Sequence, residues 1–199
     1  MATDVRALLE NIQSCYDFRD KSVIHVGAGG GQIIGYASAA RSVLAVDRDD
    51  EAVRRLGVVL REQGLLSRFI IFKGDFASVR TRADVVFFEF CLHEIADPDA
   101  ALRHAKTLAP ETLVVDHAPA SRWIWYGGEE TEVERSWEAV RRFGISRDET
   151  FMGAQQFHDY DELLAKVGVQ GELSISRIEE FRGRQGIAIQ MPYRIALLR

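Results

Sequence analysis

Residues 22–32 constrain the fold of this chain more than any other segment. Residues 23–26, of sequence VIHV, are mostly apolar and predict a buried strand, and residues 27–32 read GAGGGQ. Only glycine adopts positive φ without steric cost and brings the main chain close to a ligand with no Cβ in the way. An α/β sheet presents backbone to a nucleotide-like ligand in this manner. The segment therefore predicts a strand, a ligand-binding turn and a following helix.

Composition limits the classes of protein that fit this segment. With 199 residues, 47% of them hydrophobic, we expect one domain spanning residues 1–199. The net charge of −5 and the lack of a basic cluster argue against a nucleic-acid partner, because neutralising phosphates needs clustered Lys and Arg. We find no apolar leader and no run of membrane-spanning length, so we expect a cytoplasmic protein with no membrane partner. The spacing of Cys and His predicts neither a disulfide framework nor a metal site.

Strand-like and helix-like segments alternate along most of the chain, which predicts a parallel sheet with helical crossovers. We expect an N-terminal helix at about 2–18 and strands at about 22–26, 42–46, 68–72, 84–88 and 112–116. These strands do not alternate polar and apolar residues, as is typical of strands covered on both faces. Asp49, and Asp97 followed by Pro98, predict the starts of two intervening helices.

The pattern changes after residue 167. Residues 172–180 and 193–199 resemble two strands, with glycines near 183 and 186 between them. Strands so close in sequence pair antiparallel. We therefore predict an antiparallel hairpin at the C-terminal end of the sheet.

Polar residues follow each predicted strand in a fixed order. After the glycines, Asp47 ends the second strand, and Asp75 with Phe76 follows the third. Glu89 ends the fourth strand and opens the segment 89–95, of sequence EFCLHEI, with Asp97 and Pro98 next. In open α/β sheets, ligands bind outside the carboxyl ends of the strands. These side chains are therefore placed to meet one ligand.

This order of motifs resembles the class I S-adenosylmethionine-dependent methyltransferases of the small-molecule type, over about residues 20–199. The resemblance implies an α/β, doubly wound (Rossmann-like) sheet of seven strands, mostly parallel, with helices on both faces. One antiparallel strand would lie in the C-terminal hairpin. It also implies S-adenosyl-L-methionine as cofactor, S-adenosyl-L-homocysteine as product and a small-molecule methyl acceptor.

The resemblance assigns roles at matching positions. Asp47 would accept hydrogen bonds from the ribose hydroxyls, Asp75 would accept one from the adenine amino group, and Phe76 would pack on the adenine ring. His25 stands where the family has Asp or Glu. The predicted cofactor site consists of His25, Gly27, Gly29, Gly31, Asp47, Asp75, Phe76 and Glu89.

Two physical arguments separate this ligand from NAD. In the dinucleotide motif the third glycine falls three residues after the second, and here that position is Gln32. The acidic side chains Asp47, Asp75 and Glu89 would also repel a pyrophosphate. S-adenosylmethionine carries two positive charges against one negative charge, so it suits an acidic cleft.

Each acidic residue also has a purely structural interpretation. Asp47 and Asp75 are residue types that begin turns, and Glu89 would then be a surface glutamate. His25 is interpreted as a hydrogen-bonded, partly buried histidine rather than a base. Both interpretations stay open at the level of sequence.

Methyl transfer needs mainly a nucleophile held in line with the methyl carbon and protected from water. A general base contributes only where the acceptor loses a proton. We predict His93 and His117 as catalytic residues, because a histidine titrates near neutral pH, with Glu94 and His158 as further candidates. The alternative is that these histidines are polar residues at strand ends.

A substrate cap, or lid, is predicted at about 118–160, where the chain departs from a simple crossover. Trp123, Trp125 and Trp137 would form aromatic walls around a small acceptor, or would instead fill the core. Two other functions remain as alternatives: an NAD-dependent oxidoreductase on a related fold, and a non-catalytic protein-binding module that kept the fold. The acceptor atom is O, N or S.

Overall fold

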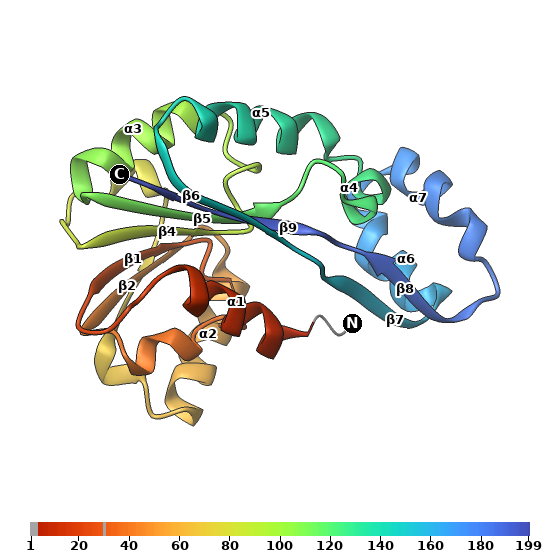
Figure 1. Cartoon of the computed structure of the whole chain (residues 1–199). Helices are drawn as coiled ribbons and strands as arrows, with labels where there is room; N and C mark the ends of the chain where they lie inside the picture. Colours follow the sequence, from red (N-terminus) through yellow and green to blue (C-terminus); the bar gives the residue numbers. More distant parts are fainter. Residues whose placement is uncertain (1–3, 30) are drawn as a thin grey trace.

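A computed structural model describes residues 4–29 and 31–199 of the chain (Figure 1). The strands are β1 Ser22–Val26, β2 Ser42–Asp47, β3 Phe69–Lys73, β4 Val85–Glu89, β5 Glu111–His117, β6 Ile145–Phe151, β7 Ala154–Asp159, β8 Gln185–Gln190 and β9 Tyr193–Leu198. The α-helices are α1 Val5–Cys15, α2 Asp50–Glu62, α3 Pro98–Leu108, α4 Arg122–Gly127, α5 Glu130–Arg141, α6 Tyr160–Val167 and α7 Glu172–Ile178. Short 3-10 turns are η1 Gly35–Ser38, η2 Leu66–Arg68, η3 Phe76–Ser78, η4 Gly168–Gln170 and η5 Glu179–Phe181.

Seven strands form one sheet in the order β3-β2-β1-β4-β5-β9-β6. Strands β1 to β5 pair in parallel, whereas β9 pairs antiparallel with both β5 and β6. This confirms the predicted fold class: a mostly parallel, Rossmann-like sheet with one antiparallel strand. Each of the first five strands begins and ends within one residue of its predicted position.

Helices cover both faces of the sheet, as predicted (Figure 1). Alternate residues of each central strand belong to different cores: Val85 and Phe87 of β4 pack with α1, α2 and η1, whereas Val86 and Phe88 pack with α3 and α5. Strands with two buried faces have no polar face to show in the sequence. This explains why the strand segments are apolar without alternation.

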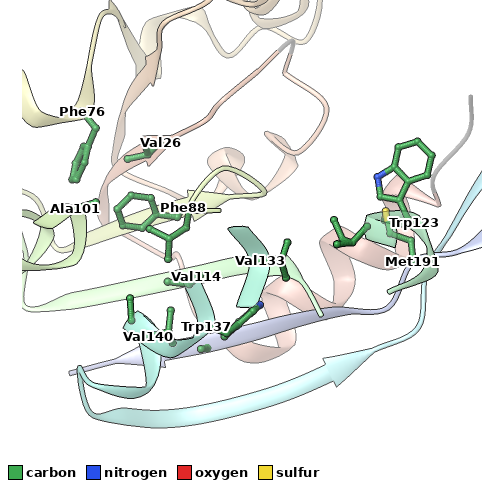
Figure 2. Close-up of a cluster of buried hydrophobic side chains, with 14 of the residues drawn as sticks. Val26, Phe76, Phe88, Ala101, Val114, Trp123, Val133, Trp137, Val140 and Met191 are labelled. Carbon is green, nitrogen blue, oxygen red and sulfur yellow. The ribbon is translucent and has the colours of Figure 1, made fainter. Parts of the chain in front are cut away.

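Figure 2 shows the core on the α3 and α5 side. Phe88 from β4 and Val114 from β5 meet Val140 and Trp137 from α5, and Phe76 closes the cluster near the end of β1. Trp137 is fully buried, and its indole Nε1 donates a 2.6 Å hydrogen bond to the carbonyl oxygen of His117. A buried indole N–H needs such a partner, so this bond fixes α5 to the end of β5.

The predicted helix starts are also observed. Asp49 and Asp97 accept hydrogen bonds from the backbone N–H groups of Ala52 and Ala100, at 2.6 and 2.8 Å. The N-terminal helix begins at Val5, and residues 2 and 3 of its predicted range lie outside the described residues. Across residues 4–29 and 31–199, no helix combines the length and apolar character needed to cross a bilayer.

The composition of the predicted C-terminal hairpin was wrong. Residues 193–198 form the antiparallel strand β9, but Glu172–Ile178 is helix α7, and the strand paired with β9 is β6. Ser174 and Ile178 are the buried residues of α7, four positions apart and therefore on one helix face. The alternation of β-branched and polar residues in this segment imitated a strand.

The segment predicted as a cap, at about 118–160, contains α4, α5, β6 and β7. Helix α5 lies beside α3 on the sheet, where it covers the core (Figure 1). Beyond the main sheet and the helices that cover it lie α4 and residues 154–190, in which β7 lies against α6, β8 lies against α4, and α7 packs on α4 and α6. The sequence change after residue 167 marked part of this smaller unit, which we call the α6–α7 unit (α4 and residues 154–190).

Replacing Phe88 by alanine tests how much the core of Figure 2 stabilises the fold. Phe88 is fully buried, so Phe88→Ala should reduce the free energy of unfolding by about 3–5 kcal/mol. The matched control is Ile70→Ala in β3, whose side chain is 71% exposed and should change it by less than about 0.5 kcal/mol. Urea unfolding followed by circular dichroism measures both. Equal losses in the two variants would contradict the described packing.

Candidate functional site

The turn after β1 brings the main chain against the end of β4. Gly27 has a φ of 72°, and a Cβ built there would lie 2.6 Å from Cys91 Cβ and 2.9 Å from the carbonyl oxygen of Glu89. Neither distance is sterically allowed, so only glycine fits. Gly31 also has positive φ, but a Cβ there would meet Leu56 of α2 at 3.0 Å. Gly27 therefore allows the ends of β1 and β4 to approach each other, and Gly31 allows the turn to pack on α2.

A cavity of about 560 Å³ lies along the carboxyl ends of β1, β2, β3 and β4. It brings together six of the eight residues predicted to bind the cofactor: Gly27, Gly29, Asp47, Asp75, Phe76 and Glu89. The other two, His25 and Gly31, do not line it. We call this space the donor cavity.

Asp47 and Asp75 both line the donor cavity and both hold the local backbone. Asp47 Oδ2 accepts a 2.8 Å hydrogen bond from Gly29 N, and its Oδ1 accepts one from Asp49 N at 3.0 Å. Asp75 Oδ1 accepts a 2.8 Å hydrogen bond from Ala77 N and so caps η3. Each carboxylate can accept more than one hydrogen bond, so these structural bonds leave room for a ligand.

Glu89 is not the surface glutamate that the alternative interpretation required. Its side chain is only 12% exposed, and its Oε2 lies 2.7 Å from Nε2 of His25, which is fully buried. Neither of these two atoms makes a regular hydrogen bond with any residue that the structure describes. Burial raises the pKa of Glu89 and the nearby Asp47 raises it further, while the contact with His25 opposes both effects.

A second cavity of about 380 Å³ adjoins the donor cavity, and we call it the acceptor cavity. The two share the residues Gly27, Gly29, Glu89, Phe90 and Glu94 in their walls. The remaining wall of the acceptor cavity includes His93, His117 and Glu129, and residues such as Gln155 and Lys166 from the α6–α7 unit. A molecule in one cavity would therefore meet a molecule in the other at the end of β1.

His93 belongs to a buried pair with Asp116. Asp116 Oδ1 lies 2.6 Å from His93 Nδ1, and Asp116 Oδ2 accepts a 3.1 Å hydrogen bond from the His93 backbone N–H. Asp116 Oδ1 also accepts a hydrogen bond from the backbone N–H of His117 at 2.8 Å. On its other side, His93 Nε2 lies 4.0 Å from Oε2 of Glu129. Asp116 thus fixes both the ring and the main chain of His93.

The two predicted catalytic histidines have opposite electrostatic environments. Burial by itself would lower the pKa of His93, but the charge and hydrogen bond of Asp116, together with Glu129 and Glu94, raise it to about 9. Burial lowers the pKa of His117 to about 4, against the attraction of Asp116 and with a further decrease from His93. His93 is therefore a cation at neutral pH, and His117 is a neutral imidazole.

His93, Asp116 and His117 offer nitrogen and oxygen atoms that all lie within 4.8 Å of one another, close enough to share a metal ion. The hydrogen bonds within the cluster favour an interpretation without a metal ion. Asp116 accepts three donors, two of them from His93, while Nδ1 of His117 has no partner among the described residues. The ring centroids of the two histidines are 5.4 Å apart. We treat the cluster as a histidine–carboxylate pair with a neutral histidine beside it.

Sequence reasoning missed three residues of this site. Asp116 could have been found, because it precedes the predicted His117 at the end of a strand. Phe90 has an unusual φ of 44° and its ring lies 4.8 Å from that of His117, but only a structure shows such strain. Glu129 lies 36 residues beyond His93 in sequence (129 − 93 = 36), and no spacing rule connects them.

The first 170 residues match the model of one protein family, whose description is "Methyltransferase domain". This match covers most of the chain, so the chain belongs to the methyltransferase domain family. The resemblance to class I S-adenosylmethionine-dependent methyltransferases is thereby confirmed. No curated protein matches the chain.

Solved structures with the same fold agree with this family. The YcgJ protein from Bacillus subtilis is 15% identical, with 96% of this chain and 97% of that chain covered and a TM-score of 0.73. A putative methyltransferase from Bacillus halodurans is 15% identical, with 97% and 98% covered and a TM-score of 0.72. A SAM-dependent methyltransferase from Aquifex aeolicus is 18% identical, with 98% and 90% covered and a TM-score of 0.61.

The donor cavity fits the cofactor of this family. Its acidic side chains follow the strand order from Asp75 beyond β3, through Asp47 on β2, to Glu89 on β4. Glu89 Oε2 is a buried carboxylate oxygen without a regular hydrogen bond. This acidic wall offers few hydrogen-bond donors. A ligand with net positive charge would fit it, whereas a pyrophosphate would be repelled by it.

Titration of the imidazole groups tests the described electrostatics. By two-dimensional NMR, His93 should titrate at a pH of about 9 and His117 at about 4. Asp116→Asn should move the His93 midpoint down toward the ordinary value of about 6.5, because the opposite charge is removed. An unchanged His93 midpoint in Asp116→Asn would contradict the ion pair.

The same pKa values set the direction of a pH effect on stability. The folded-state pKa of His93 lies above its unfolded value of about 6.5, so its pairing stabilises the fold fully below that pH. This contribution is lost as pH rises through about 9. The folded-state pKa of His117 is depressed, so its contribution is present above about 6.5 and is lost as pH falls through about 4.

Proposed function

We propose that the protein transfers the methyl group of S-adenosyl-L-methionine to a small-molecule acceptor by in-line displacement, leaving S-adenosyl-L-homocysteine. One observation carries this proposal: the donor and acceptor cavities share a wall at the end of β1, formed by Gly27, Gly29, Glu89, Phe90 and Glu94. In-line transfer requires two molecules to meet at a fixed place from which water is excluded. Asp47, Asp75 and Phe76 would hold the nucleoside part of the cofactor, as the family resemblance implies.

The sulfonium of the cofactor supplies a good leaving group. The protein itself would therefore bind and orient the two molecules and accept one proton from the acceptor. His93 lines the acceptor cavity, and Asp116 holds its ring by Nδ1. This leaves Nε2 as the nitrogen that would accept the proton of an acceptor hydroxyl or thiol. His117 would remain neutral beside it and contribute a polar surface.

The basicity of His93 favours one class of acceptor. A base with a pKa of about 9 exchanges a proton most readily with a group of similar acidity. A phenol, with a pKa of about 10, and a thiol, at about 8.5, match it on the scale of the Tyr and Cys side chains. An aliphatic alcohol is a far weaker acid. We therefore favour a phenolic hydroxyl or a thiol as the methyl acceptor.

The α6–α7 unit would act as the cap of the acceptor cavity within one domain of residues 1–199. Trp123 of α4 lines that cavity and stacks on Phe157 of β7, with ring centroids 5.8 Å apart. Trp125 is 42% exposed and carries the guanidinium of Arg177 over its ring at 4.7 Å. Trp137 belongs to the core. Of the three tryptophans, Trp123 is thus the one placed to form an acceptor wall.

Calorimetry with two ligands separates this function from its alternatives. S-adenosylhomocysteine should bind the wild-type protein with heat that saturates at one site per chain, and NADH should not. Binding of NADH alone would favour the oxidoreductase, and binding of neither ligand would favour a protein-binding module. A screen of phenols and thiols with S-adenosylmethionine, scored by formation of S-adenosylhomocysteine, would then identify the acceptor.

The pH dependence of methylation tests the role assigned to His93. With a phenol or thiol acceptor, kcat/KM should increase with pH up to an apparent pKa of about 9, because His93 has to lose its proton first. Asp116→Asn should lower the plateau by about 100-fold and move the apparent pKa to lower pH. Asp99→Asn is the matched control, because Asp99 pairs with Arg142 at 2.6 Å outside both cavities.

Three outcomes would contradict this role. One is a pH profile that follows the acidity of each acceptor instead of a constant enzyme pKa. Another is an Asp116→Asn profile that keeps its wild-type midpoint. The last is loss of activity in a chelator with recovery on adding a divalent metal, which would assign the cluster of His93, Asp116 and His117 to a metal ion.

A further inference from the structure

His25 cannot touch a ligand in either cavity. It stands at the end of β1, where the family has an acidic residue, but its side chain has no exposed surface and lines neither cavity. Its ring is stacked on Phe87 at a centroid distance of 4.6 Å and an interplanar angle of 16°. His25 thus occupies the position of the family's acidic residue but does not reach the ligand space.

His25 instead connects two other side chains. Its Nδ1 lies 2.9 Å from the hydroxyl oxygen of Tyr36, and its Nε2 lies 2.7 Å from Glu89 Oε2. Tyr36 is fully buried in η1, and burial together with the charge of Glu89 holds its pKa well above the ordinary value. It therefore stays a neutral hydroxyl, able to donate to Nδ1. Nε2 of His25 faces the carboxylate of Glu89.

Glu89, the last residue of this series of contacts, lies at the ligand space. It lines both cavities, and its buried Oε2 has no regular hydrogen bond among the residues that the structure describes. Asp47 lies close enough in the same donor cavity to raise the pKa of Glu89 by repulsion. A desolvated carboxylate next to a second carboxylate is satisfied best by a cationic hydrogen-bond donor.

The order of the strands shows which part of the cofactor would meet Glu89. Asp75 follows β3, Asp47 ends β2 and Glu89 ends β4, with the glycines that follow β1 between the last two. Asp75 and Asp47 carry the proposed contacts to adenine and ribose, so the amino-acid tail would extend past β1 toward β4. Its ammonium has N–H groups to donate, whereas a sulfonium has none.

We propose that Glu89 binds the ammonium group of the cofactor in place of the acidic residue that β1 lacks, and that His25 and Tyr36 are positioning residues that hold its carboxylate from behind. The inference rests on the proposed function. It assigns His25 to the support of the cofactor site rather than to contact with the cofactor, and it explains how a buried histidine is tolerated at this position.

A pair of ligands isolates the ammonium contact. S-adenosylhomocysteine carries the amino-acid tail, and 5′-methylthioadenosine has the same nucleoside and sulfur without that tail. In calorimetry, Glu89→Gln should weaken binding of S-adenosylhomocysteine at least tenfold and change binding of methylthioadenosine less than twofold. Asp47→Asn is the matched control, because loss of a ribose contact should weaken both ligands by the same factor.

The same comparison of affinities, for S-adenosylhomocysteine and for methylthioadenosine, tests the positioning residues. Tyr36→Phe keeps the ring and removes the hydroxyl, so it should weaken S-adenosylhomocysteine about threefold and leave methylthioadenosine unchanged. His25→Phe keeps a flat ring against Phe87 and removes both nitrogens, and it should act in the same direction and more strongly. A merely structural role would weaken both ligands together. Thermal melting confirms that each variant is folded, and Glu89→Asp replaces Glu89→Gln if the latter does not fold.

The outcomes distinguish this inference from the proposed function. Equal losses for the two ligands in Glu89→Gln, or an unchanged affinity for S-adenosylhomocysteine, would overturn the assignment of Glu89 while leaving methyl transfer intact. An effect in Glu89→Gln with none in Tyr36→Phe and His25→Phe would overturn the positioning roles alone. Absence of binding of either ligand to the wild-type protein would overturn the proposed function together with the inference.

Discussion

The close approach of the β1 end to the β4 end is the constraint on which the site depends. A Cβ at Gly27 would lie within 3 Å of both Cys91 and the carbonyl of Glu89, so the two strand ends are packed backbone to side chain. This contact places the glycine turn, Glu89 and Phe90 in one wall, with the donor cavity on one side and the acceptor cavity on the other. Any larger residue at position 27 would force these two strand ends to shift apart.

The predictions that succeeded were those that depend only on neighbouring residues in the sequence. The first five strands, the Asp49 and Asp97 caps and the acidic residues at strand ends all follow from neighbouring residues, and the parallel sheet brings these ends together. Residues 172–178 failed because their helical face has only two buried positions, so that periodicity of 3.6 was hidden by the alternating pattern. The partner of β9 is likewise set by long-range contacts, with residues 152–192 between the paired strands.

The sequence predicted where the site residues lie in the fold, but not which of their side chains contact one another. Sequence placed His25, Glu89, His93 and His117 near the ligand, yet it did not show which of them are in contact. His25 pairs with Glu89 and not with the ligand space, and His93 is held by Asp116, which is 23 residues away. Such pairs arise because a buried charge needs a partner, and the partner is chosen by the sheet order rather than by sequence distance.

His25 and His93, two of the three buried histidines among the described residues, are each held through one ring nitrogen. His25 contacts a hydroxyl with one ring nitrogen and faces a carboxylate in the wall of the donor cavity with the other. His93 receives a carboxylate on Nδ1 and faces the acceptor cavity with the remaining nitrogen, which leaves a group able to exchange a proton. In each case the fold gives one ring nitrogen a fixed partner, so the orientation of the other nitrogen is fixed as well. His25 contacts Glu89, which lines both cavities, whereas His93 lines the acceptor cavity alone.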